Sequence, residues 1–142
     1  SLDANEPQVK LRGGYPICKT QPDRLLQGGD HVGSLEVIAT PGHTPGHAAF
    51  LDSRDRTLIG GDAFQTLGGV AVSGKLEVLF PLPALATWDK PLALESARKL
   101  LAFAPAQLAV GHGRVLANPV QEMERAIATF ARELDRQRQH VA

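Results

Sequence analysis

The sequence predicts an α/β fold of the α+β type, with a mainly antiparallel sheet and two helices on one face. Apolar runs joined by turns at residues 33–34 and 52–56 predict hairpins. Two longer amphipathic stretches, residues 89–104 and 119–137, predict the helices. Each helix has a single apolar stripe, so we expect both to bury it in one layer against the same face of the sheet. The chain, residues 1–142, has the length of a single domain.

Turn residues mark the ends of the predicted strands. The Gly-Ser pair at residues 33–34 is typical of a tight hairpin turn. The polar stretch 52–56 separates the apolar runs 48–51 and 57–59, which predicts a second hairpin. Because a hairpin joins antiparallel neighbours, most of the sheet is predicted to be antiparallel.

Four other short runs are candidate strands. Residues 108–110 predict a buried strand that ends at a glycine-flanked histidine, and residues 9–11 predict a short strand near the N-terminus. Residues 70–72 and 76–80 lie in a stretch rich in glycine and proline. We interpret them as strands, with a mobile loop beside the site as the alternative.

The first helix is predicted to begin at Asp89 and to end before Pro105. Proline is tolerated in a first turn, as at Pro91, but it stops a helix from continuing. The residues expected on the buried face are Ala93, Ala97, Leu100, Leu101 and Ala104.

The second helix is predicted to begin after Asn118, which we interpret as a cap, with Pro119 at the first helical position. Its apolar residues recur three and four positions apart, as one face of a helix requires. They are Val120, Met123, Ile127, Phe130 and Leu134.

Composition excludes several classes of partner. Fifteen basic and fifteen acidic residues give a net charge of zero, so nothing indicates nucleic-acid binding. No apolar run approaches the roughly 20 residues of a membrane span. Cys18 is the single cysteine, so no internal disulfide can form, and a reducing, cytoplasmic location is the default expectation.

Three glycine-rich loops each carry a residue that can bind a metal. His43 lies in the octet TPGHTPGH, residues 40–47; Asp62 follows two glycines, and His112 lies between two. Zinc takes imidazole nitrogen and carboxylate oxygen, and a carboxylate on a glycine-flanked loop can bridge two metals. We therefore expect the three side chains to converge at one edge of the sheet.

Each candidate also has an ordinary structural interpretation. His43 could be a loop histidine satisfied by backbone hydrogen bonds, Asp62 a turn or capping carboxylate, and His112 a turn residue. The spacing of His47 from His43 would suit two ligands on a helix, but Pro45 and the following glycine prevent a helix there. We interpret His47 as a packing residue or as one that supports a ligand, with direct ligation as the alternative.

These loops closely resemble the later motifs of the metallo-β-lactamase fold, which includes hydrolases of the glyoxalase II and lactonase type. The resemblance implies that His43 ligates one metal, that Asp62 bridges two, and that His112 ligates the second. It implies two zinc ions per complete site, although iron or manganese use similar ligands. The family's upstream His-x-His-x-Asp-His motif is absent from this chain. No two of its five histidines are separated by one residue: His31, His43, His47, His112 and His140.

The chain therefore resembles the C-terminal half of an αββα sandwich without its N-terminal half. The resemblance implies a hydrolase that cleaves an ester, thioester or lactone of a small molecule through metal-bound hydroxide. The superfamily's nuclease branches are less favoured because no basic patch is visible. The chain alone is expected to be inactive, to have an empty or adventitiously occupied metal site and to form a homodimer or a larger assembly. The alternative is a truncated or degenerate domain without catalysis that folds and self-associates.

Overall fold

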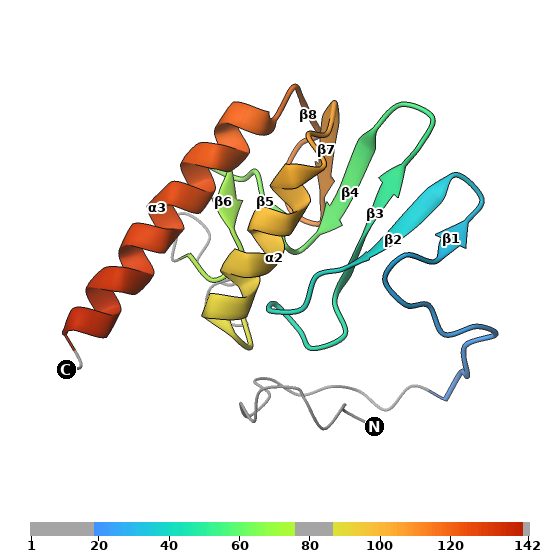
Figure 1. Cartoon of the computed structure of the whole chain (residues 1–142), viewed down its shortest axis with the longest axis horizontal. Helices are drawn as coiled ribbons and strands as arrows, with labels where there is room; N and C mark the ends of the chain where they lie inside the picture. The colour runs from blue at the N-terminus through green and yellow to red at the C-terminus, as the bar shows by residue number, and fades with distance from the viewer. Residues whose placement is uncertain (1–18, 76–86, 141–142) are drawn as a thin grey trace.

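A six-stranded sheet carries two long helices on one face in this computed structural model (Figure 1), which describes residues 19–75 and 87–140. The strand order in the sheet is β1-β2-β3-β4-β7-β8. The strands are β1 His31–Val32, β2 Leu35–Ala39, β3 Ala48–Asp52, β4 Thr57–Gly61, β7 Gln107–Val110 and β8 Leu116–Ala117.

The pairing confirms a mainly antiparallel sheet. Strands β1 to β4 form successive antiparallel pairs, so both predicted hairpins are present. β7 then pairs with β4 in parallel, and β8 returns antiparallel to β7. The parallel pair is possible because helix α2 lies on the connection between its two strands.

A separate two-stranded pair follows β4 in the chain. β5 Phe64–Gln65 pairs antiparallel with β6 Ala71–Val72. β6 confirms the predicted strand at residues 70–72, whereas neither β5 nor β8 was predicted. The strands predicted at residues 9–11 and 76–80 lie outside the described residues.

Helix α2 spans Lys90–Ala102 and begins as predicted. The Asp89 carboxylate accepts the Leu92 amide at 2.9 Å, which satisfies one of the free donors of the first turn. The helix ends two residues before the predicted Ala104, because Ala104 has a positive φ of 45° and precedes a proline. Ala104 is exposed, so its predicted place on the buried face is wrong, while Leu94 is buried.

Helix α3 spans Val120–Gln139 and buries the predicted stripe from Met123 to Leu134. Its start differs from the prediction: Pro119 is the N-cap, and no side chain caps the helix. Asn118 has a φ of 51°, a conformation that asparagine tolerates. Its backbone N–H donates to the Ala106 carbonyl at 2.8 Å. Asn118 is therefore a turn residue and not a cap.

One hydrophobic core joins the helices to the inner face of the sheet. It contains Ala97 and Leu100 from α2, and Met123, Ile127 and Phe130 from α3, packed with strand residues that include Ile38, Ala49, Leu58 and Leu108. The predicted sharing of one layer by the two helices is confirmed.

The opposite face of the sheet is also apolar. The strand register places Phe50, Ile59 and Ala109 side by side there, and Ile59 is 39% exposed. In the described part of the chain, neither helix is long and apolar enough to cross a membrane.

Candidate metal centre

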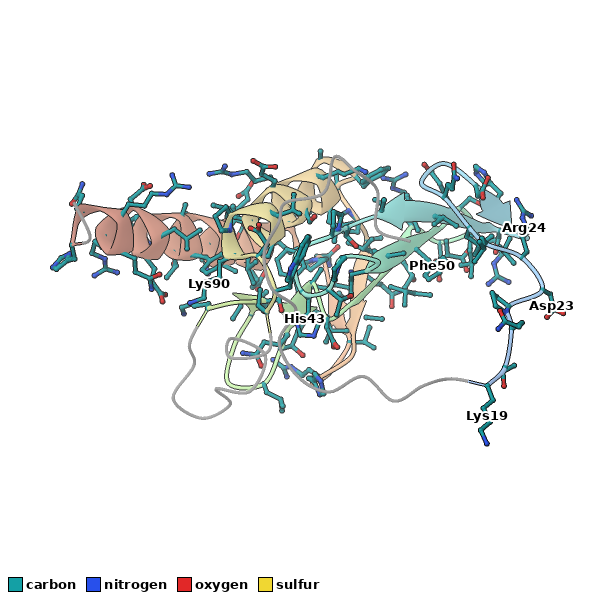
Figure 2. The ribbon with its side chains drawn as sticks, turned by 90° about the horizontal axis from the view of Figure 1, so that it is seen from below. Lys19, Asp23, Arg24, His43, Phe50 and Lys90 are labelled. Carbon is teal, nitrogen blue, oxygen red and sulfur yellow. The ribbon has the colours of Figure 1, made fainter. Side chains whose placement is uncertain are left out.

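The octet loop is held by its own backbone and by the start of α2. The Thr40 amide donates to the His47 carbonyl at 3.0 Å, which closes the loop. The amides of Trp88 and Asp89 donate to the carbonyls of His43 and Gly42 at 3.0 and 2.9 Å. The loop that carries His43 is therefore fixed at both of its sides. Figure 2 shows His43 near the middle of the molecule, far from Lys19.

The parallel pairing of β4 with β7 brings the other two candidates together. Both strands end at the same edge of the sheet, so the residues that follow them are neighbours. The Gly111 amide donates to the Gly61 carbonyl at 2.9 Å. The register shifts between Ile59 and Gly61, and such an irregularity can re-aim the side chain that follows it.

The three predicted residues converge on the Asp62 carboxylate. His43 Nε2 lies 3.6 Å from Asp62 Oδ2, and His112 Nε2 lies 3.6 Å from Asp62 Oδ1. The side chain of His43 is 15% exposed and that of His112 is 47% exposed. The expected convergence at one edge of the sheet is confirmed, and each carboxylate oxygen faces a different imidazole.

These spacings fit metal ligands. Two donors on a tetrahedral zinc ion, each about 2.0–2.2 Å from the metal, lie about 3.3–3.6 Å apart. Each of the two histidine–carboxylate pairs meets that spacing at its upper end. Within residues 19–75 and 87–140, however, no group of three or more His, Cys, Asp or Glu side chains is arranged to hold one ion. The geometry thus offers two partial sites with a shared carboxylate and not one complete site.

Glycine at two positions makes room for the site, at Gly111 for the Asp62 carboxylate and at Gly61 for the His47 ring. A Cβ built on Gly111 would overlap Asp62 Oδ1. Gly61 has a φ of 51°, and a Cβ there would lie 2.9 Å from His47 Nε2. A side chain at either position would force the surrounding groups to move.

Two buried hydroxyls orient His43. Ser73 Oγ lies 2.9 Å from His43 Nδ1, and Thr87 Oγ1 lies 3.4 Å from the same nitrogen. If Nε2 keeps its lone pair for a metal, Nδ1 carries the proton and donates to Ser73. Burial lowers the pKa of His43, and Asp62 opposes this shift only in part, so the ring is neutral at pH 7.

His47 is bonded through both ring nitrogens. Its Nε2 accepts the Asp62 amide at 3.1 Å, and its Nδ1 lies 2.8 Å from Thr40 Oγ1. His47 therefore contacts the backbone of a predicted ligand, as the interpretation of a supporting residue requires.

The sequence did not reveal the hydroxyl groups of the site. Thr40, Ser73 and Thr87 are each no more than 2% exposed. Ser73 and Thr87 are 30 and 44 positions from His43, so no local pattern relates them to it. Of these three residues, Thr40 alone had a sequence signal for a place in the site, because it is the first residue of the octet.

Comparison with known proteins agrees with this combination of fold and site. The profile of the metallo-beta-lactamase superfamily matches residues 6–112. The chain belongs to the metallo-beta-lactamase superfamily.

Two Bacillus subtilis (strain 168) proteins are similar in sequence. The chain is 53% identical over 128 residues to the uncharacterized protein YobT, covering 89% of this chain and 55% of YobT. It is 40% identical over 79 residues to the probable metallo-hydrolase YflN, covering 54% of this chain and 30% of YflN. The chain thus spans about half of the first relative and a third of the second.

Two solved structures share the fold. A metallo-beta-lactamase family protein from Thermus thermophilus is 29% identical with a TM-score of 0.61, over 81% of this chain and 37% of that chain. TTHA1623, solved in a di-iron-bound form, is 26% identical with a TM-score of 0.53, over 72% of this chain and 46% of that chain.

Proposed function

We propose that this chain is the C-terminal half of a hydrolase and supplies some of the ligands of its dimetal centre. The metals proposed are two zinc ions. The bond cleaved would be an ester, thioester or lactone of a small molecule. The observation that carries the proposal is the Asp62 carboxylate, whose two oxygens each face an imidazole at 3.6 Å. A carboxylate can bridge two metals, because each of its oxygens can act as a ligand to one of them.

Each residue has one role in this proposal. Asp62 would be shared by the two metals, while His43 would hold one of them and His112 the other, each through Nε2. When bound, the metals supply Lewis-acid activation of the carbonyl and of water at neutral pH. Ser73 holds the His43 ring in place by accepting a hydrogen bond from Nδ1–H, so that Nε2 stays directed at the carboxylate.

The remaining ligands must come from outside these residues. Each metal would see one histidine and the shared carboxylate, against the three protein ligands of a usual catalytic zinc site. The chain spans 55% of YobT, so about half of such a relative lies outside the match and could supply them. The chain alone is therefore proposed to bind metal weakly and to catalyse nothing.

The di-iron-bound form of TTHA1623 supports a site for two metals. Metal identity follows from elemental analysis of a longer protein that contains this chain. We expect two ions per chain in the unmodified protein. Asp62→Asn should lose both ions, whereas His43→Ala and His112→Ala should each lose mainly one.

Isothermal titration of zinc into the 142-residue chain tests the partial-site proposal. Weak binding without ester hydrolysis is expected. A tight isotherm for two ions together with hydrolysis would show that the chain is a complete enzyme. A longer protein that binds no metal at all would favour the non-catalytic domain.

A further inference from the structure

We propose that Thr40 and His47 are positioning residues that fix the backbone of Asp62 and so aim its two carboxylate oxygens at His43 and His112. The inference rests on the proposed dimetal centre. It assigns a function to the second histidine of the octet, whose ring is near the centre without being one of its ligands.

The hydrogen bonds determine the tautomer of His47. The Asp62 amide can only donate, so His47 Nε2 must be the acceptor, at 3.1 Å. A neutral ring then carries its proton on Nδ1, and this N–H donates to Thr40 Oγ1 at 2.8 Å. The bonds thus run in one direction, from the Asp62 amide through the imidazole to the threonine hydroxyl.

Neither nitrogen of His47 is left for a metal. Direct ligation would require Nε2 to release the Asp62 amide, which would leave a half-buried donor without its partner. Ligation through Nδ1 would require the ring to leave Thr40, which is 1% exposed. Holding Asp62 and binding a metal are therefore mutually exclusive for this ring.

Asp62 needs this support because the sheet no longer holds it. The regular register between β4 and β7 is broken after Ile59, and the last ladder contact is the Gly111 amide to the Gly61 carbonyl. The next amide after β4, that of Asp62, points to His47 instead of to a strand. The bond from the Asp62 amide therefore fixes the peptide plane from which the carboxylate projects.

The observed position of the His47 ring requires a residue without a side chain at Gly61. A Cβ on Gly61 would lie 2.9 Å from His47 Nε2, so the ring occupies the space where a side chain would be. Thr40 is itself fixed, because its amide donates to the His47 carbonyl at 3.0 Å. Two hydrogen bonds between Thr40 and His47 thus hold the ring that accepts the Asp62 amide.

The tautomer can be measured in the unmodified chain. We expect the side-chain nitrogen NMR spectrum of uniformly ¹⁵N-labelled chain at pH 8 to show His47 with a protonated Nδ1 and a bare Nε2. A coupling across the hydrogen bond should join Nε2 to the Asp62 amide nitrogen. A proton on Nε2 would overturn the proposal, because that nitrogen could then not accept from Asp62.

Three variants separate positioning from stability. Thr40→Val removes the hydroxyl, Thr40→Ser restores it, and Ser96→Ala is the matched control. Ser96 is buried and donates to the Pro41 carbonyl at 2.6 Å, so it holds the same loop without reaching Asp62. Zinc is titrated into each chain while the side-chain nitrogen signals of His43 and His112 are followed, which measures even millimolar dissociation constants.

We expect Thr40→Val to weaken zinc binding by about 10–100-fold, the usual effect of losing a residue that orients a ligand. Thr40→Ser should recover most of this loss. Ser96→Ala should lower the thermal midpoint and leave zinc affinity unchanged. Equal affinity in Thr40→Val and the unmodified chain, or an equal loss in Ser96→Ala, would overturn the proposal. If a longer protein that contains this chain binds no metal, the dimetal centre fails, while the tautomer still decides whether His47 holds Asp62.

Discussion

At Gly111 the candidate site has no room for a side chain. A Cβ there would overlap Asp62 Oδ1, whereas one at Gly46 in the octet would meet nothing within 4 Å. We expect Gly111→Ala to reduce zinc affinity by about 10–100-fold, because the displaced carboxylate loses its orientation. Gly46→Ala is the control and should bind as the unmodified chain does. Calorimetric titration of both variants makes the comparison, and equal affinities would contradict the fitted position of the carboxylate.

The buried histidines make stability depend on pH. Burial lowers the pKa of His43 and His47 from the ordinary value of 6.5. The unfolded chain therefore binds more protons than the folded chain as pH falls below about 6.5, and folding loses stability in that range. We expect the urea concentration at the unfolding midpoint of the metal-free chain to decrease as the pH is lowered from 7 to 5.

His47→Asn should flatten part of that slope. Asp52 does not add to it, because hydrogen bonds from the Arg54 side chain and amide hold the pKa of the Asp52 carboxyl well below its usual range. Its contribution to stability is lost only in stronger acid. A urea midpoint that stays constant from pH 7 to pH 5 would show that the histidines are not buried as described.

The two helices begin in different ways, and this difference can be measured. Asp89 caps α2 through a bond to the Leu92 amide, so Asp89→Ala should cost about 1 kcal/mol of unfolding free energy. Asn118 makes no cap for α3 and has a φ of 51°. Asn118→Gly should therefore change stability by less than about 0.5 kcal/mol, because glycine accepts that conformation and keeps the amide. Urea unfolding of both variants is the measurement, and similar losses would contradict the assigned caps.

The elements that the sequence predicted are those with a long or a sharply bounded pattern. The hairpin around Gly33 and the stripe of α3 belong to this group. β5 and β8 contain two residues each, which is too short for any periodicity to appear. The end of α2 was placed too late because Ala104 is a good helix former whose conformation is set by the proline after it.

The candidate metal-binding residues were predictable from the sequence, whereas the hydroxyl groups that support them were not. Glycine-flanked loops after apolar runs indicated His43, Asp62 and His112, and the structure brings these side chains together. Hydroxyl partners have no characteristic spacing, since the fold alone decides which serine or threonine reaches an imidazole. The parallel pairing of β4 with β7 was also not predicted, because pairing partners distant in the chain leave no local signal.

The apolar outer face of the sheet predicts self-association of the whole molecule. Phe50, Ile59 and Ala109 lie side by side on it, and a groove of about 420 Å³ lined by Val37, Trp88 and Leu92 adjoins the octet loop. We expect the chain to form dimers or larger assemblies through this face, since exposed apolar patches mark contact surfaces.

Ile59→Lys should shift the chain to monomer in sedimentation velocity. Leu67→Lys is a matched control: Leu67 is 42% exposed against 39% for Ile59, but it lies in a loop and not on the sheet. A monomeric unmodified chain, or equal dissociation in both variants, would contradict the assignment of the interface.

The parallel pairing of β4 with β7 also has a kinetic consequence. The hairpins close over turns of a few residues, whereas β4 and β7 meet only after the intervening chain, including α2, has been looped out. We predict that Asp62 and His112 become neighbours only after the rate-limiting barrier of folding, so that substitutions at either residue change the unfolding rate and not the folding rate. A metal that needs both residues would slow unfolding and leave the folding rate unchanged. Its uptake would lengthen the lifetime of a chain that has already folded, without helping a new chain to fold.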